Sequence, residues 1–235
     1  MNRLQSELQR LYLLPSARPT DVGDGAEPVR SMVLELARPA DWDALSRVWR
    51  GVQADLDLPA PAIAVSGTDG LQLWFSLQQP ASPARAAAFL AQLQSRYLPD
   101  VAPARLRAMP SATAPAWQAA PVPTQQAATE NWSAFVAPDL APVFADTPWL
   151  DIPPGIEGQA DLLARLKPIT PDALEAAMQR LQPPQAPLPA TPSPSEHRSE
   201  TPGVDPRQFL QQVLNDETVA LALRIEAAKA LLHRP

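Results

Sequence analysis

Apolar residues recur every three or four positions in three stretches of the first 110 residues. The stretches 2–14, 41–53 and 82–97 each place their large apolar side chains on one side of a helical turn. Asp41 and Ser82 stand immediately before two of them, where a short polar side chain can accept a hydrogen bond from the first turn. The pattern therefore predicts three amphipathic helices.

Four other stretches in this region have the pattern of strands. Ser31–Ala37, Ala62–Val65 and Ala104–Met109 are short and largely apolar, and Leu71–Leu77 alternates strictly between apolar and polar residues. The alternation predicts a half-buried strand with Gln72, Trp74 and Ser76 on its less buried face. The glycines of the Ser66–Gly70 turn predict an antiparallel hairpin. The predicted order is β-α-β-β-α-β, an α+β fold with a ferredoxin-like or RRM-like core and helices on one side of an antiparallel sheet.

Proline divides the rest of the chain. The chain contains 30 prolines, and each one fixes φ and lacks a backbone donor. Residues 111–181 are predicted to form a Pro-interrupted helical region, with Thr170 capping its last helix. The helices expected there are Glu130–Val136, Pro138–Phe144, Glu157–Leu166 and Pro171–Leu181. The predicted organisation is an N-terminal helix and loop (1–29), the α/β core (30–110), the helical region (111–181), a linker (182–203) and a C-terminal module (204–235).

The linker and the C-terminal module carry a separate prediction. Residues 182–203 contain seven prolines with few large apolar residues, which is typical of a disordered or polyproline tether. Residues 204–235 have two amphipathic patches that predict a helix pair too small to be stable alone. The pair must bury its apolar residues against its own domain or against a partner. The length of the tether favours a partner protein.

Composition excludes several kinds of site. The chain has no cysteine, and its two histidines, His197 and His233, lie near the C-terminal end. Disulfides, thiol nucleophiles and cysteine zinc sites are therefore excluded, and a histidine triad or metal cluster is not expected. The residues favour no cofactor. No apolar run reaches the length of a membrane helix, and the N-terminus lacks a signal-peptide core, so we expect a cytoplasmic protein without a membrane partner.

Charge argues against a dedicated nucleic-acid binder. The net charge is −6, residues 1–110 carry 11 basic and 11 acidic groups, and residues 111–200 carry 4 basic and 10 acidic groups. Proteins that bind nucleic acid through phosphates carry a basic surface. We therefore expect weak nucleic-acid binding or none.

One segment has a recognisable chemical pattern. In Val65–Trp74 a strand ends, the backbone turns at Gly67 and Gly70, and a second strand leaves with Gln72 and Trp74 on one face. The amides of such a turn can bind an anion. The segment resembles the S-G-x-x-G-x-H motif of archaeo-eukaryotic primases, and most of all the polymerase domain of bacterial end-joining DNA ligases. The resemblance covers residues 30–110.

The resemblance implies a nucleotide site and a metal site. In that family the Ser and His of the motif contact nucleotide phosphates, an Asp-x-Asp pair holds the divalent metal, and a later strand adds a third Asp. The residues of this chain that the resemblance and the sheet face select as nucleotide or phosphate contacts are Ser66, Gly67, Gly70, Gln72, Trp74, Arg105 and Arg107.

The chain departs from the family where the chemistry would occur. Gln72 stands at the histidine position, and the preceding strand offers Glu35 alone, with Ala37 where a second carboxylate belongs. Two-metal phosphoryl transfer needs several carboxylates. We therefore predict no metal site, with Glu35 as the vestigial candidate, and an uncertain enzymatic status that leans toward no activity.

Three functions remain open from the sequence. The first is a non-catalytic primase-polymerase-like protein, accessory to bacterial DNA replication, repair or a mobile element, that binds a nucleotide or a partner protein. The second is a protein interaction scaffold with no nucleotide site. The third is an active enzyme in which Glu35 and either Asp41 or Asp43 hold the metal.

Overall fold

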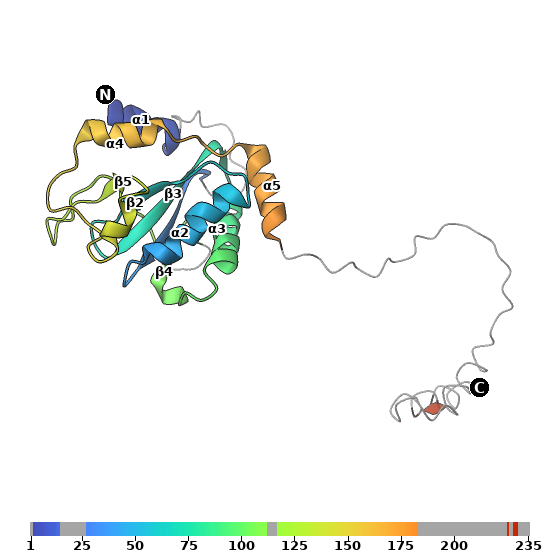
Figure 1. Ribbon diagram of the computed structural model, residues 1–235. Coiled ribbons are helices and arrows are strands. Elements are labelled where there is room, and N and C mark those ends of the chain that lie inside the picture. The colour runs from blue at the N-terminus through green and yellow to red at the C-terminus, as the bar shows by residue number, and fades with distance from the viewer. Residues whose placement is uncertain (1, 15–26, 112–116, 183–224, 226–227, 230–235) are drawn as a thin grey trace. The chain divides into compact units, whose positions relative to one another are not determined.

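The computed structural model describes residues 2–14, 27–111 and 117–182, together with Ile225, Ala228 and Lys229, and these last three are helical. The chain divides into two compact units, Met1–Gln185 and Ala186–Pro235. The predicted linker after residue 182 and most of the predicted helix pair lie outside the described residues. The first unit is α+β and contains every helix and strand described below (Figure 1).

The first part of the unit contains a strand-helix-strand-strand-helix-strand run, as the apolar pattern predicts. Its elements are β1 (Val29–Ala37), α2 (Trp42–Ala54), β2 (Ala62–Val65), β3 (Gly70–Ala81), α3 (Pro83–Tyr97) and β4 (Leu106–Met109). The predicted caps are confirmed, because the Asp41 side chain accepts a hydrogen bond from the backbone of Ala44 and Ser82 accepts one from Arg85. A short 3-10 helix, η1 (Pro103–Arg105), occupies the start of the predicted strand 104–109.

The remaining elements surround this run. They are α1 (Arg3–Leu11), β5 (Ala134–Val136), the 3-10 helix η2 (Ala141–Phe144), α4 (Ile156–Ala164) and α5 (Pro171–Leu181). The helix at the N-terminus and the helices at 157–166 and 171–181 are confirmed, and Thr170 caps the last of them as predicted. None of the helices in the described part of the chain combines the length and the apolar character needed to span a bilayer.

The five strands form one antiparallel sheet in the order β4-β1-β3-β2-β5. The helix predicted for Glu130–Val136 is wrong, because Ala134–Val136 is the strand β5 and pairs with β2. The burial that this pairing gives Ala134, Phe135 and Val136 outweighs their weak helical pattern. A segment from beyond residue 110 thus extends the sheet of the predicted core.

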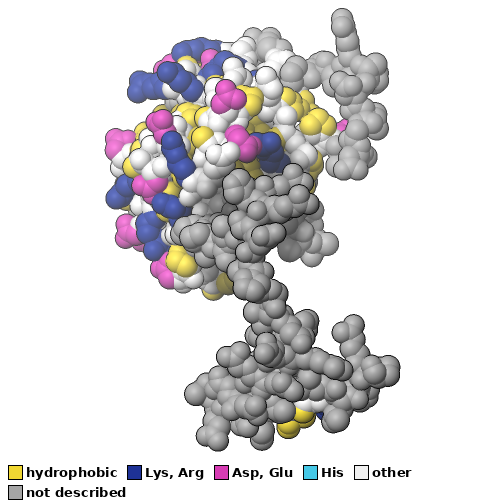
Figure 2. All heavy atoms as spheres, turned by 90° about the vertical axis from the view of Figure 1, so that its right-hand side faces the viewer, with side chains coloured by type: hydrophobic (Ala, Val, Ile, Leu, Met, Phe, Trp, Pro, Cys, Tyr) yellow, Lys and Arg dark blue, Asp and Glu magenta, His cyan; other side chains and the backbone are white. Residues whose placement is uncertain are grey.

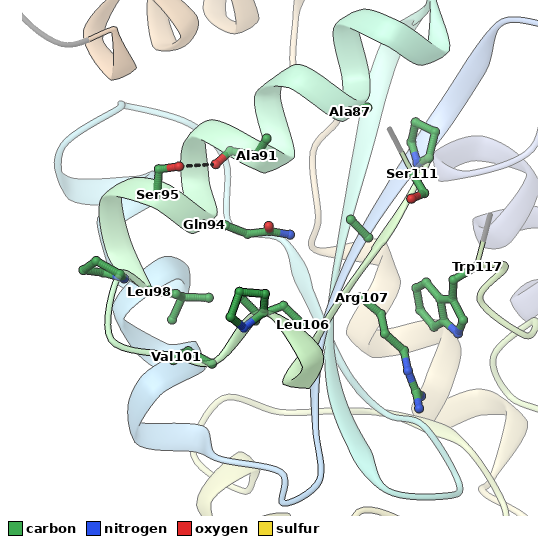
Figure 3. Close-up of a pocket in the computed structure, with 14 residues that line it drawn as sticks. Ala87, Ala91, Gln94, Ser95, Leu98, Val101, Leu106, Arg107, Ser111 and Trp117 are labelled. Carbon is green, nitrogen blue, oxygen red and sulfur yellow. Dashed lines mark hydrogen bonds between the residues drawn. The ribbon is translucent and has the colours of Figure 1, made fainter. Parts of the chain in front are cut away.

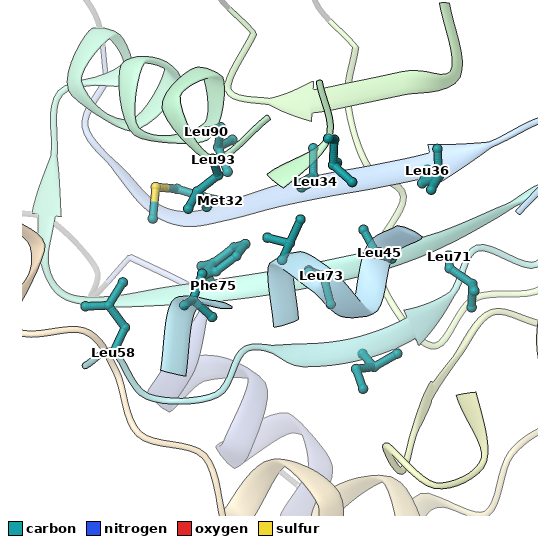
Figure 4. Packing of buried hydrophobic residues seen from close by; sticks show 14 of the residues in the cluster. Met32, Leu34, Leu36, Leu45, Leu58, Leu71, Leu73, Phe75, Leu90 and Leu93 are labelled. Carbon is teal, nitrogen blue, oxygen red and sulfur yellow. The ribbon is translucent and has the colours of Figure 1, made fainter. Parts of the chain in front are cut away.

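The two sheet faces are covered by different helices. On one face α2, α3 and α5 pack against the apolar side chains of β1 and β3, including Met32, Leu34, Leu73 and Phe75 (Figure 4). On the other face α1 lies beside α4, and both cover residues that include Val33, Trp74 and Phe135 (Figure 1). The expectation of a half-buried β3 is therefore wrong, since Gln72, Trp74 and Ser76 are also buried. Helices distant in sequence cover the side that the strand pattern left open.

Candidate functional site

The glycine turn between β2 and β3 is closed by its own hydrogen bonds. The Ser66 Oγ accepts hydrogen bonds from the backbone N–H groups of Thr68 (3.1 Å) and Gly70 (2.9 Å). The Ser66 N–H donates to the Gly70 carbonyl, and the Gly67 N–H donates to the carbonyl of Pro148. Four amides of the predicted anion-binding turn, at residues 66, 67, 68 and 70, therefore have protein acceptors.

The two glycines of the turn are there because the backbone and its neighbours leave no room for a side chain. Gly67 has φ +78°, and a Cβ there would lie 2.8 Å from the Ser133 backbone nitrogen. A Cβ on Gly70 would lie 2.9 Å from the Glu35 Cγ. The motif glycines thus bring the turn close to Glu35 and to the chain beyond residue 120.

Three strands bring a polar network together beside this turn. Glu35 on β1 lies opposite Gln72 on β3 and opposite Arg107 on β4. The Gln72 Nε2 donates to Glu35 Oε2 at 2.6 Å, and the Arg107 NH1 donates to Glu35 Oε1 at 2.6 Å. The Trp74 Nε1 donates to Gln72 Oε1 at 2.8 Å. We call Glu35, Gln72, Trp74 and Arg107 the strand network.

The strand network contains a charge pair that is buried at one end. The side chain of Glu35 is 2% exposed and that of Arg107 is 26% exposed. Burial raises the pKa of the Glu35 carboxyl, while the hydrogen bond from Gln72 and the guanidinium of Arg107 oppose this shift. A buried carboxylate needs such partners, because the loss of hydration is not otherwise compensated.

A second carboxylate completes the charges at the exposed end of the network. The Oδ1 of Asp69 lies 3.5 Å from Arg107 NH1, and its Oδ2 lies 3.6 Å from the Nε of Arg38. The guanidinium of Arg107 therefore lies between Glu35 and Asp69. Two carboxylates and two guanidinium groups balance one another here, so the site carries no excess positive charge for a phosphate.

Trp74 is part of the hydrophobic core on the sheet face that α1 and α4 cover. It is 7% exposed, and its ring centroid lies 5.4 Å from that of Tyr12 and 6.1 Å from that of Phe135, both in edge-to-face geometry. Tyr12 directly follows α1, so that helix closes this side of the sheet over the indole. The arrangement leaves the Trp74 ring as a packing element under α1, and stacking of a base on it would require α1 to move.

Arg105 lies apart from Arg107. The sequence selects both arginines as phosphate contacts, but Arg105 belongs to η1 and its NH2 donates to the carbonyl of Pro39 at 2.7 Å. Asp41 lies 3.9 Å from the same group. Arg105 therefore holds the connection between β1 and α2 against the start of β4. It is not part of the strand network.

The carboxylates suggested as an alternative metal site do not converge. Asp41 and Asp43 belong to the start of α2, where Asp41 caps the helix, whereas Glu35 is bound by Gln72 and Arg107. The described residues contain no group of three or more His, Cys, Asp or Glu side chains suited to a metal ion. The residues at the position implied by the primase resemblance do not fit a divalent metal, because a guanidinium already bridges the two available carboxylates.

Two residues of this site escape the sequence pattern. Asp69 has the character of an ordinary turn residue, and Gln126, whose Nε2 donates to the Ser66 carbonyl at 3.2 Å, lies 60 positions away. The only sequence feature that could have pointed to Asp69 is its acidic side chain inside the glycine motif. Nothing in the local pattern points to Gln126, because its contact depends on the path of the chain after residue 117.

Comparison with known proteins leaves the family open. No family model matches the chain, and no curated protein matches its sequence.

Proposed function

We propose that this chain is a non-catalytic, primase-polymerase-like protein that acts by binding a partner protein in bacterial DNA replication, DNA repair or a mobile element. The finer part of the proposal is that β1 to β4 with α2 and α3 form a ferredoxin-like core. The strand order β4-β1-β3-β2 supports it, since a β-α-β-β-α-β chain with both helices on one face of an antiparallel sheet has that order.

The position of Arg107 is the observation that carries the proposal. Its guanidinium lies between Glu35 and Asp69, and Glu35 stands at the strand position where the primase resemblance implies a metal ligand. Phosphoryl transfer needs metal ions that bridge the phosphates and neutralise developing charge. A side chain fixed between the carboxylates neutralises them permanently and offers no exchangeable ligand position, which supports a binding role over catalysis.

The turn favours a protein partner over a nucleotide. The motif amides donate to Ser66 and to backbone carbonyls, and the carboxylate of Asp69 at the turn would repel a phosphate. On the face in Figure 2, basic and acidic side chains lie interspersed, which also suits a protein surface better than a phosphate-binding one. Nucleotide contact by Ser66, Gly67, Gly70 and Gln72 is the second candidate, supported by the resemblance alone.

A primer-extension assay tests the catalytic part. The full chain with Mg²⁺ or Mn²⁺, primer-template and nucleoside triphosphates should extend nothing, because the metal ligands are missing. Glu35→Ala is the matched variant. Extension that disappears in Glu35→Ala would overturn the proposal, and extension that persists would identify a contaminant.

Anisotropy with labelled ATP and with labelled single-stranded DNA tests the ligand. At physiological salt we expect no complex tighter than about micromolar, the usual scale of non-specific contacts. A tighter complex that is lost on Gln72→Ala but kept on Gln78→Ala would instead favour the nucleotide site.

The interaction scaffold proposed as the alternative rests on residues 204–235. Their two apolar patches need a surface to bury against. Ending the chain at residue 182 tests this proposal, because loss of a co-purifying protein with an unchanged melting temperature indicates docking on a partner. A melting temperature several degrees lower indicates docking on the chain's own domain.

A further inference from the structure

A groove follows the outer side of β4. It has a volume of about 630 Å³ and lies between α3 and β4, with Trp117 at one end (Figure 3). The α3 side is lined by Ala87, Ala91, Gln94 and Ser95, and Leu98 lines it just after the helix. A volume of this size accommodates several residues of a peptide.

The groove runs along the edge of the strand and not along one sheet face. Leu106, Arg107 and Ala108 are consecutive in β4, so their side chains alternate between the two faces, and yet all three line the same groove. Figure 3 shows Leu98, which follows α3, on one side of β4, and Arg107 and Trp117 on the other. Within the described sheet β4 pairs with β1 alone. The backbone groups of its outer edge therefore face the groove.

The opposite edge of the sheet, at β5, is by contrast covered by a side-chain amide. At β5, the Gln159 Oε1 accepts from the Phe135 N–H at 2.7 Å, and the Gln159 Nε2 donates to the Phe135 carbonyl at 2.9 Å. Gln159 is a buried residue of α4. Its side-chain amide thus takes the place of a neighbouring strand at β5. At β4 the side chain of Gln94 lines the groove, but no described side-chain amide hydrogen-bonds to the β4 backbone.

The hydrogen-bond donors of Arg107 select the ligand of the groove. Arg107 is the one charged side chain among the described residues that line it, and none of those residues is a carboxylate. The hydrogen bonds that Arg107 makes to Glu35 and Asp69 both come from NH1. Among the described residues no acceptor takes a hydrogen bond from its Nε or NH2, so these donors can receive a third carboxylate side on.

We propose that the β4 edge binds an extended segment of a partner protein, which adds a strand to the sheet, places an apolar side chain against Ala87 and Ala91, and places an acidic side chain against Arg107. Main-chain hydrogen bonds to β4 would provide affinity and the two side-chain positions would provide specificity. This surface lies outside residues 204–235, and its existence does not depend on a primase ancestry.

Selection of displayed peptides tests the proposal on the full chain. A random library of linear peptides of about 12 residues is selected on the wild-type protein, and the enriched peptides are measured on two variants. Ala91→Trp fills the groove from α3, and Ala88→Trp puts the same side chain at an exposed position of α3 that does not line it. We expect peptides with alternating apolar residues and an acidic residue, whose binding is at least about tenfold weaker on Ala91→Trp and unchanged on Ala88→Trp.

N-methylated peptides distinguish strand addition from other binding. Methylating alternate backbone nitrogens of an enriched peptide should abolish binding in one phase and leave it in the other, because alternate amides of an added strand face β4. Equal binding to Ala91→Trp and wild type, no enriched peptide, or insensitivity to both methylation phases would overturn the proposal. If the chain self-associated through this groove, its measured mass would rise with concentration in the wild type and not in Ala91→Trp. That result would also overturn the proposal, in favour of a second copy of the chain as the ligand.

Discussion

The two faces of the sheet are made by alternate residues of the same strands, and they are stabilised differently. Met32, Leu34, Leu73 and Phe75 face α2 and α3 and contribute nothing but apolar surface. Glu35, one position from Leu34, faces the other side and joins the strand network. A one-residue step along β1 therefore separates hydrophobic packing from a buried charge pair.

The difference shows how each face tolerates change. The apolar face depends on area and packing, which respond to volume and not to pH. The network face depends on complete hydrogen bonding, since a charge left without its partner costs more than the pair contributes. Substitutions on the two faces and at the β5 edge of the sheet should therefore change the free energy of unfolding by different amounts and with different pH dependence.

Removal of a large side chain from the apolar face should have the largest effect. Phe75 is 1% exposed and its ring meets that of Phe89 edge to face, with centroids 6.0 Å apart. Phe75→Ala should lower the free energy of unfolding by about 4 kcal/mol, through lost transfer energy and a cavity. Urea denaturation measures it. Gln78→Ala, at the exposed end of β3, is the control, and an equal cost for both variants would contradict a core role.

Breaking the charge pair should cost less, and a second substitution should recover part of it. Arg107→Ala leaves Glu35 buried without its guanidinium, which should cost about 3 kcal/mol near neutral pH. In a Glu35→Gln background the same substitution should cost clearly less, because a neutral amide needs no counterion. A double-mutant cycle by urea denaturation measures the coupling. Additive costs would argue that Glu35 and Arg107 do not act as a pair.

Opening the edge at β5 should have a smaller effect. Gln159→Met keeps the approximate shape of the side chain but removes both hydrogen bonds to the Phe135 backbone, at a cost of about 2 kcal/mol. Thermal unfolding measures the loss, with Arg165→Ala on the exposed end of the same helix as the control. A Gln159→Met protein as stable as the control would mean that water replaces the amide.

The pH dependence of the network should give the smallest effect. Because burial raises the pKa of Glu35 above its ordinary value of 4.5, the folded chain binds that proton more tightly than the unfolded chain does. This stabilisation is complete below the ordinary pKa and is lost as the pH rises through the raised one. Wild type should therefore lose stability relative to Glu35→Gln over that interval, by about 1.4 kcal/mol for each pH unit that separates the two pKa values.

Urea denaturation of wild type and Glu35→Gln at a series of pH values from about pH 4 upward measures this difference, since the loss begins near the ordinary pKa of a carboxyl. Phe75→Leu on the apolar face is the control, and its difference from wild type should not vary with pH. A wild-type protein that instead gains stability over Glu35→Gln with rising pH would mean that Arg107 and Gln72 outweigh burial.

Local sequence patterns were sufficient for the parts of the fold that depend on near neighbours. The spacing of apolar residues and the caps Asp41, Ser82 and Thr170 predicted helices that the structure contains. Alternation in Leu71–Leu77 predicted β3 and its apolar face. These features follow from the period of side chains along a helix or a strand, and that period can be read from a short stretch of sequence without the rest of the chain.

Tertiary structure decided everything that needed partners distant in the chain. It made Ala134–Val136 a strand because β2 offered an edge, and it buried Trp74 because α1 and Phe135 lie over it. It also made the Glu35 carboxylate the centre of a network, since strand order places Arg107 opposite it across 72 positions. A sequence specifies which side chains carry charge, but the pairing of strands determines whether such a charge holds a metal, meets solvent or is neutralised by another side chain.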